Sequence, residues 1–254
     1  ESKTGIKTNF VNYMGGLSEI KAQVESGNIK WDIMDVFALD TIAGCEDGLF
    51  VKFDFDKDFA PAPDGTPASQ DFITSMPSKC AVGNVMYSWI WAYNTKNVSR
   101  KPKTIKDFFN TKKFPGKRAL FKSALHNLEI ALAADGVKPG KGGDNIYKKL
   151  KTKKGLQRAL YKIKALCEDP MGGCVFWSTG AQPAELLVSG EVVMSTAWNT
   201  RMFNAEIGGG APIKIVWDAQ IIDYEYFVLV KNGPNYKNGK ALKILREMTS
   251  PAGM

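Results

Sequence analysis

The spacing of apolar residues changes twice near the start of the chain, which predicts a strand, a helix and a second strand. Residues 6–12 alternate between apolar and polar side chains, and residues 17–25 have apolar positions at helical spacing. Residues 31–38 form a near-continuous apolar run, which is typical of a buried strand. This order is that of a βαβ unit with a right-handed crossover, so we expect a largely parallel sheet here.

A long strand follows a polar stretch. Residues 51–79 contain prolines, hydroxyl side chains and aspartates, which indicates an excursion over the surface. Residues 82–93 then form an apolar and aromatic strand that exceeds the usual length of about 5–6 residues. Such a strand suits a segment that leaves one lobe and enters another. We therefore expect two lobes, one made of residues 1–86 and 223–254 and the other of residues 87–222.

The remaining patterns alternate between helices and strands, so the predicted fold class is α/β. Thr104 and Asp107 have the spacing of a capping box, which marks a helix start. Further helices are predicted at residues 125–134, 153–167, 183–188 and 238–249. Further strands are predicted at the end of 114–121 and at 174–177, 191–197, 214–217 and 226–230.

The composition is that of a globular protein, with 254 residues, 44% of them hydrophobic and 24% charged. No apolar run reaches the ~18 residues that a membrane-spanning helix needs. Lysine and arginine (34) outnumber aspartate and glutamate (26). The lysines are spread around helical segments, and neither an aromatic-rich RNA-binding motif nor a Cys/His finger accompanies them. We expect a solvated basic face and no nucleic-acid partner.

The four cysteines are expected to form two disulfides. Cys167 and Cys174 flank a turn-rich hexapeptide that can bring their Cα atoms within bonding range. Cys45 ends a predicted helix and Cys80 begins a predicted strand, which makes them the second pair if both face one lobe edge. The alternative is four buried thiols in a cytosolic protein. No CxxC motif supports a zinc ribbon or a redox site.

Side chains for catalysis, metal binding or cofactor binding are scarce. The single histidine, His126, lies among leucines at the start of helix 125–134, which favours a structural or surface role. The motifs GxSxG and HExxH are absent, and the glycine-rich residues 140–143 and 208–210 lack the Lys-Ser/Thr pair of a phosphate-binding loop. The aspartates within residues 56–64 lack EF-hand spacing. We expect no catalytic residue, no metal and no cofactor.

Side chains that could hold a small molecule are better represented. Ser178, Thr179 and Gln182 stand at a predicted helix start, where hydroxyls and backbone amides can bind a polar or anionic group, although the hydroxyls could also simply cap the helix. Trp198 follows strand 191–197, at the carboxyl end where α/β sheets bind ligands. We expect Trp198 to stack on a ligand.

Carboxylates and aromatic rings also alternate just before a strand. Asp223, Tyr224, Glu225 and Tyr226 could hold a cationic amine by charge and cation–π contact. The tyrosines could instead pack across strands. A third possibility is a ferric ion held by Tyr224 and Tyr226.

Together these motifs resemble, in order, the spermidine/putrescine-type extracellular solute-binding proteins of ABC importers. The resemblance covers essentially the whole chain and lies in residues 6–16, 31–49, 87–94, 113–118, 176–201 and 233–235. It implies a type II periplasmic-binding-protein-like fold with a ligand cleft between two α/β lobes that close by hinge motion. It also implies a periplasmic monomer that delivers its ligand to a membrane ABC permease and carries out no reaction.

The resemblance assigns roles to several residues. Trp198 matches an aromatic that flanks the ligand, Tyr224 approximates a second stacking position, and Asp223 or Glu225 lies near the carboxylate that receives an amine. Further expected contacts are Tyr13, Asp40, Thr41, Ser88 and Trp89. The ligand implied is a small amine such as putrescine or spermidine.

Two departures change that expectation. Lys122, Ser123 and His126 stand where polyamine binders carry an acidic pair. Arg201 adds a cation that would repel a polyamine and attract a carboxylate or phosphonate, unless it forms a structural salt bridge. A zwitterionic or carboxylated amine is therefore the rival ligand.

A rival from another class is a thiaminase-like transferase on the same fold, which would need a free cysteine nucleophile. The two ends of the chain also carry a signal. Thr4-Gly5 reads as a helix end, and Ser250-Pro251 reads as a helix start, so we expect a fragment cut at both ends.

Overall fold

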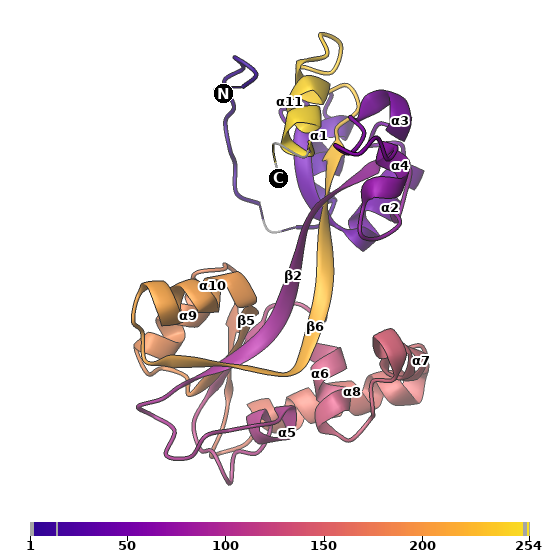
Figure 1. Ribbon diagram of the computed structural model, residues 1–254. Coiled ribbons are helices and arrows are strands. Elements are labelled where there is room, and N and C mark those ends of the chain that lie inside the picture. The colour runs from indigo at the N-terminus through magenta and orange to yellow at the C-terminus, as the bar shows by residue number, and fades with distance from the viewer. Residues whose placement is uncertain (1–2, 14, 251–252, 254) are drawn as a thin grey trace. The chain divides into compact units, whose positions relative to one another are not determined.

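The computed structural model describes residues 3–13, 15–250 and 253. The chain divides into two compact units, residues 1–86 with 224–254 and residues 87–223. Two strands, β2 (Ala81–Asn94) and β6 (Ile213–Leu229), each begin in one unit and end in the other (Figure 1). The expected lobes differ from these units only in the place of Asp223. That the units are ligand-binding lobes stays a prediction.

The first unit is built around the antiparallel pair of β1 (Ile33–Phe37) and the end of β6, in which Phe37 lies opposite Glu225. Its helices are α1 (Ser18–Glu25), α2 (Ala38–Glu46), α3 (Phe55–Asp58), α4 (Ala68–Asp71) and α11 (Lys240–Met248). Met34, Val36 and Val228 are buried on this pair, because alternate side chains of a strand face the same side.

The predicted strand over residues 6–12 is wrong, and so is the parallel βαβ unit that depended on it. The described part of this segment forms no strand, and Phe10 and Val11 are 87% and 66% exposed. Alternation alone does not supply a neighbouring strand with which the backbone can pair. Consequently β1 pairs antiparallel with β6, and the first unit shows no parallel pair among its described residues. Pro251 and Ala252, in the predicted final helix start, lie outside the described residues.

The second unit contains a mixed sheet. The strand β5 (Met194–Trp198) pairs antiparallel with β2, while β3 (Arg118–Phe121) pairs parallel with both β5 and β4 (Cys174–Trp177). Its α-helices are α5 (Ile105–Phe108), α6 (Asn127–Ala134), α7 (Asp144–Leu150), α8 (Lys153–Cys167), α9 (Gln182–Val188) and α10 (Asn199–Phe203). A short 3₁₀ helix, η1 (Lys141–Gly143), precedes α7, and a π-helical turn, η2 (Asn204–Gly208), follows α10. The predicted capping box of Thr104 and Asp107 is present at the start of α5.

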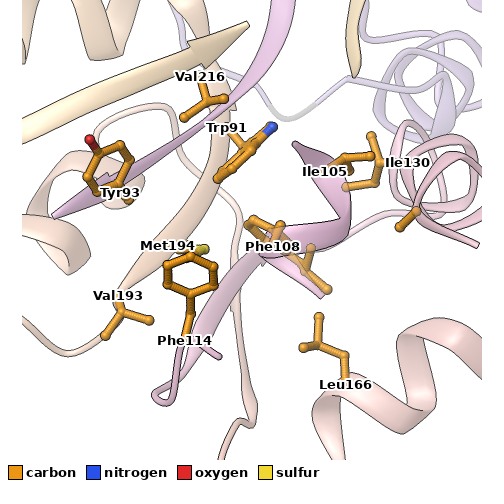
Figure 2. Packing of buried hydrophobic residues seen from close by; sticks show 12 residues of the cluster. Trp91, Tyr93, Ile105, Phe108, Phe114, Ile130, Leu166, Val193, Met194 and Val216 are labelled. Carbon is orange, nitrogen blue, oxygen red and sulfur yellow. The ribbon is translucent and has the colours of Figure 1, made fainter. Parts of the chain in front are cut away.

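A large apolar cluster fills the second unit beneath this sheet. Figure 2 shows Trp91, Phe108, Phe114 and Met194 converging with Leu166. The rings of Trp91 and Phe108 meet edge to face with centroids 5.7 Å apart. Because α5, α6 and α8 all contribute to this cluster, these helices pack against the strands β2, β3 and β5 at the density of a protein core.

The predicted strands over residues 214–217 and 226–230 are parts of one strand, β6, of 17 residues. The polar stretch between them suggested a loop, but most of its side chains are only partly buried, and such a strand accepts polar residues. The helix α7 was not predicted, whereas α8 has the predicted bounds. No helix among the described residues is long and apolar enough to cross a membrane.

Both predicted disulfides are confirmed. Cys45 and Cys80 have Cα atoms 5.7 Å apart, and Cys167 and Cys174 have Cα atoms 4.6 Å apart. All four cysteines belong to the described residues and none is free. The alternatives that needed free thiols, namely a cytosolic four-thiol protein and a cysteine-dependent transferase, are therefore wrong.

Replacing Cys45 and Cys80 with alanine is expected to lower the free energy of unfolding by about 3–4 kcal/mol, because the bridge restricts a long loop of the unfolded chain. The same change at Cys167 and Cys174 should cost about 2–3 kcal/mol, because their separation is 7 residues rather than 35. Urea unfolding of the two double variants tests the order. A larger loss from the shorter loop would contradict it.

Candidate functional site

Four aromatic rings meet where the strands of the second unit end. Phe121, Trp177 and Trp198 are the last residues of β3, β4 and β5, and parallel pairing brings strand ends to one edge of the sheet. Trp89 on β2 lies opposite Trp198 in the antiparallel pair. The centroid of Trp198 is 5.3 Å from that of Trp177 and 5.6 Å from that of Trp89, with the rings near edge to face. We call these four residues the aromatic cluster.

Members of the aromatic cluster differ in exposure. Trp89, Phe121 and Trp177 are buried, so they support the cluster from within. Trp198 is only partly buried, yet its indole Nε1 is buried without a hydrogen-bond partner among the described residues. An indole donor of this kind usually finds a partner when buried. Trp198 is therefore the member that best fits its predicted contact with a ligand, and Trp89 is less accessible than expected.

The side chain of Gln182 stabilises the turn that precedes α9. Gln182 Oε1 accepts hydrogen bonds from the backbone N–H groups of Ser178 (2.6 Å) and Thr179 (3.0 Å). These amides are consequently not available to an anionic ligand, contrary to the expectation for this helix start. The hydroxyls of Ser178 and Thr179 and the amide nitrogen of Gln182 remain the predicted polar contacts of this turn.

Gly180 brings this turn close to two predicted ligand residues. A Cβ atom at Gly180 would lie 2.7 Å from Trp198 Cζ3 and 3.0 Å from Arg201 Nε. The absence of a side chain therefore lets the Trp198 ring and the Arg201 side chain rest against the turn. Arg201 is exposed on α10 and forms no ion pair or hydrogen bond with any described residue. No described carboxylate therefore forms the structural salt bridge that was the alternative role of Arg201.

A carboxylate lies beside the aromatic cluster. Asp223 Oδ2 is 3.2 Å from His126 Nε2 and accepts a hydrogen bond of 3.3 Å from the Tyr87 hydroxyl. The Tyr87 oxygen also accepts a hydrogen bond from Trp89 Nε1 at 3.3 Å. The His126 ring stacks on Trp89 with centroids 4.1 Å apart. His126 is thus structural, as expected, and it also contacts a predicted ligand residue.

Two further ionisable residues near this carboxylate were not predicted. Burial raises the pKa of Glu129, on the first turn of α6, and the charge of Asp223 adds to that shift. Burial also raises the pKa of Tyr147 on α7, with Glu129 and Asp223 adding to it. The sequence signal for Glu129 was its place three residues after His126 on a predicted helix. Nothing in the sequence pointed to Tyr147.

The first unit has its own group of carboxylates, around Tyr13. The pKa of this phenol is strongly raised, first by burial and then by the charges of Asp40, Asp35 and Glu225. The Tyr13 hydroxyl donates to the Asp35 carbonyl, and the Gly16 N–H donates to Asp40. Desolvation also raises the pKa values of the Asp35 and Asp40 carboxyls, although the Asp35 residue as a whole is well exposed. Asp35 escaped prediction because it sits within an apolar strand.

Three predicted contacts have structural partners. Thr41 is fully buried and its hydroxyl donates to the Ala38 carbonyl. Ser88 is buried, and its hydroxyl donates a hydrogen bond of 2.9 Å to Gln220 Oε1. Tyr226 is buried opposite Val36, which fits the packing alternative. Among the described residues, no group of three or more His, Cys, Asp or Glu side chains is arranged to hold a metal.

Residues 1–254 match the model of the bacterial extracellular solute-binding proteins. The chain belongs to this family. It is a family of solute-binding proteins rather than of enzymes, as the sequence predicted.

Three known proteins are similar to this chain. The gamma-aminobutyric acid (GABA)-binding protein of Pseudomonas aeruginosa is 38% identical over 223 residues, which are 88% of this chain and 58% of that protein. The binding protein MotA of A. tumefaciens B6, solved with glucopine, is 30% identical with a TM-score of 0.79, over 97% of this chain and 71% of its own. A solved GABA receptor is 29% identical with a TM-score of 0.76, over 99% of this chain and 71% of its own.

These likenesses confirm the α/β periplasmic-binding-protein-like fold class. The chain spans 58% of the length of the Pseudomonas relative. The solute-binding family that the sequence predicted is confirmed, but its spermidine/putrescine type is not.

Replacing Gly180 with alanine is expected to displace the Trp198 ring and to lower the free energy of unfolding by about 1–3 kcal/mol, because the new methyl overlaps Trp198 Cζ3. Near-UV circular dichroism and urea unfolding measure both effects. Gly208→Ala is the matched control, since a Cβ there meets no atom within 4 Å. Equal behaviour of the two variants would contradict the packing argument.

Replacing Asp40 with asparagine is expected to stabilise the protein at pH 7. Desolvation raises the pKa of Asp40 in the folded protein, so the folded state loses stability as pH rises through that pKa. Asparagine keeps an acceptor for Gly16 without the charge, and the gain should shrink as pH falls towards about 4. Urea unfolding at several pH values tests this, with the exposed Asp71→Asn as control. A gain that grows at low pH would refute it.

Proposed function

We propose that this protein is the substrate-binding component of an ABC importer and acts in the periplasm. Its ligand is a small solute that carries both an ammonium and a carboxylate group. The observation that carries this proposal is Arg201, an exposed cation without an ion-pair partner among the described residues, held beside the partly exposed ring of Trp198. The similarity to a GABA-binding protein and to a GABA receptor supports the same ligand chemistry, because GABA carries both groups.

Arg201 is the proposed carboxylate contact. A guanidinium binds a carboxylate through two parallel hydrogen bonds, which fixes the orientation of the ligand as well as its charge. Gly180 lets this side chain approach the turn of residues 178–182, so the hydroxyls of Ser178 and Thr179 are the proposed secondary contacts. A polyamine has no carboxylate, and Arg201 would repel its ammonium groups.

Asp223 is the proposed ammonium contact of the second unit. It accepts a hydrogen bond from the Tyr87 hydroxyl, and its carboxylate attracts an ammonium group by charge. Trp198 stacks against the carbon chain of the ligand in this proposal. Tyr224 and Glu225 are retained as proposed contacts on the basis of the family resemblance alone.

A diamine is the second candidate ligand, and one observation favours it. Asp35, Asp40 and Glu225 all raise the pKa of Tyr13 by their charge, so the first unit concentrates negative potential at that phenol. These carboxylates of the first unit attract an ammonium group by charge. The position of Arg201 makes this candidate the weaker one. A membrane permease as partner and a monomeric state also remain proposals.

Calorimetric titration of the wild-type protein distinguishes these ligands. GABA is expected to bind and putrescine to bind at least tenfold more weakly, because the guanidinium attracts one ligand and repels the other. Arg201→Met should weaken GABA binding by roughly 10- to 100-fold, as expected for loss of a charge-assisted contact. Arg100→Met removes another exposed arginine of the second unit and is the matched control. Tighter binding of putrescine than of GABA by the wild type would overturn the proposal.

A further inference from the structure

His126 has a backbone conformation that few residues adopt. It lies directly before α6 with φ of 65° and ψ of −27°, in the left-handed region. Non-glycine residues in this region persist where the surrounding structure enforces them, and they concentrate at functional sites. The residue is 95% buried, so the conformation places an imidazole inside the second unit.

Contacts on two sides fix the orientation of this imidazole. One face stacks on Trp89, with an angle of 26° between the rings. The edge that carries Nε2 points to Asp223 Oδ2 at 3.2 Å. The Tyr87 hydroxyl donates to the same oxygen, and Trp89 Nε1 donates to Tyr87. Two donors held by the Trp89 indole thus converge on one carboxylate oxygen.

The other ring nitrogen indicates the protonation of the imidazole. His126 Nδ1 is buried and has no hydrogen-bond partner among the described residues. A protonated Nδ1 would be a buried donor of a charged group left unpaired, which costs more than an unpaired neutral acceptor. The neutral form with the proton on Nε2 satisfies the contact with Asp223 and avoids that cost.

We propose that His126 is a positioning residue that, with Tyr87, holds the Asp223 carboxylate in place for the ammonium group of the ligand. This inference rests on the proposed function. A neutral imidazole donates a hydrogen bond to Asp223 without cancelling its charge, whereas an arginine or lysine there would neutralise the carboxylate. Asp223 therefore keeps its attraction for a cation while its rotation is restricted, which lowers the entropy lost on binding.

Ligands that lack either the ammonium or the carboxylate group test whether His126 acts on the ammonium contact. GABA carries both charged groups, butylamine lacks the carboxylate, and butyrate lacks the ammonium. His126→Phe keeps a ring that can stack on Trp89 but removes the donor to Asp223. Its dissociation constants for GABA and butylamine should rise about tenfold, while that for butyrate should stay within about twofold. Calorimetry, with displacement of GABA for the weaker ligands, measures all three.

Two variants serve as controls. His126→Gln retains an N–H donor and is expected to recover most of the lost affinity, whereas a role in packing alone would not be rescued by a non-aromatic side chain. Tyr161→Phe alters an exposed tyrosine of α8 and should change nothing. Tyr87→Phe removes the other donor to the same oxygen and should act in the same direction as His126→Phe. It replaces His126→Phe in the test if that variant does not fold.

The chain contains one histidine, so its imidazole signals in a ¹⁵N spectrum of the ligand-free protein are unambiguous. We expect the Nε2–H tautomer, and an Nδ1–H tautomer would overturn the inference. An equal loss of affinity for all three ligands, or no loss, would also overturn it. Wild-type protein that binds none of the three ligands would instead refute the proposed function, and with it the ligand assigned to Asp223.

Discussion

Parallel pairing of β3 with its two neighbours determines where the chemistry of the second unit gathers. Because β3, β4 and β5 run in the same direction, their final aromatic residues reach one edge of the sheet and pack together. Trp89 completes the aromatic cluster from the antiparallel strand β2. The buried rings of this cluster support Trp198 from behind, so the one partly exposed ring is also a well-fixed one.

Polar groups around the aromatic cluster are placed by that packing. The Trp89 indole stacks on His126 with its ring and donates to Tyr87 with its nitrogen, so one side chain orders both donors to Asp223. Trp198 packs against Gly180 next to Arg201. A carboxylate and a guanidinium are thereby positioned through aromatic side chains, which is the arrangement that the proposed zwitterionic ligand requires.

The sequence predicted individual helices and strands better than it predicted which strands pair. The helix over residues 153–167 was found with its exact bounds, because its amphipathic pattern begins after a threonine that caps it. The strand over residues 6–12 was not found in the structure, because its alternation says nothing about a partner. Trp198 and Arg201 were predicted as ligand contacts from their place after a strand, and that role stays a prediction. The contact of His126 with Asp223 was missed, since the two residues lie far apart in the chain and only the fold brings them together.

The two units are formed by different parts of the chain. The second unit is one continuous stretch, whereas the first requires residues from both ends, because β1 pairs with the last part of β6. A ribosome therefore releases all of the second unit before the sheet of the first can be completed. The second unit can fold while synthesis continues, and the early residues must wait for the late ones. Until then β1 is an unpaired edge, which makes the order of synthesis a factor in avoiding aggregation.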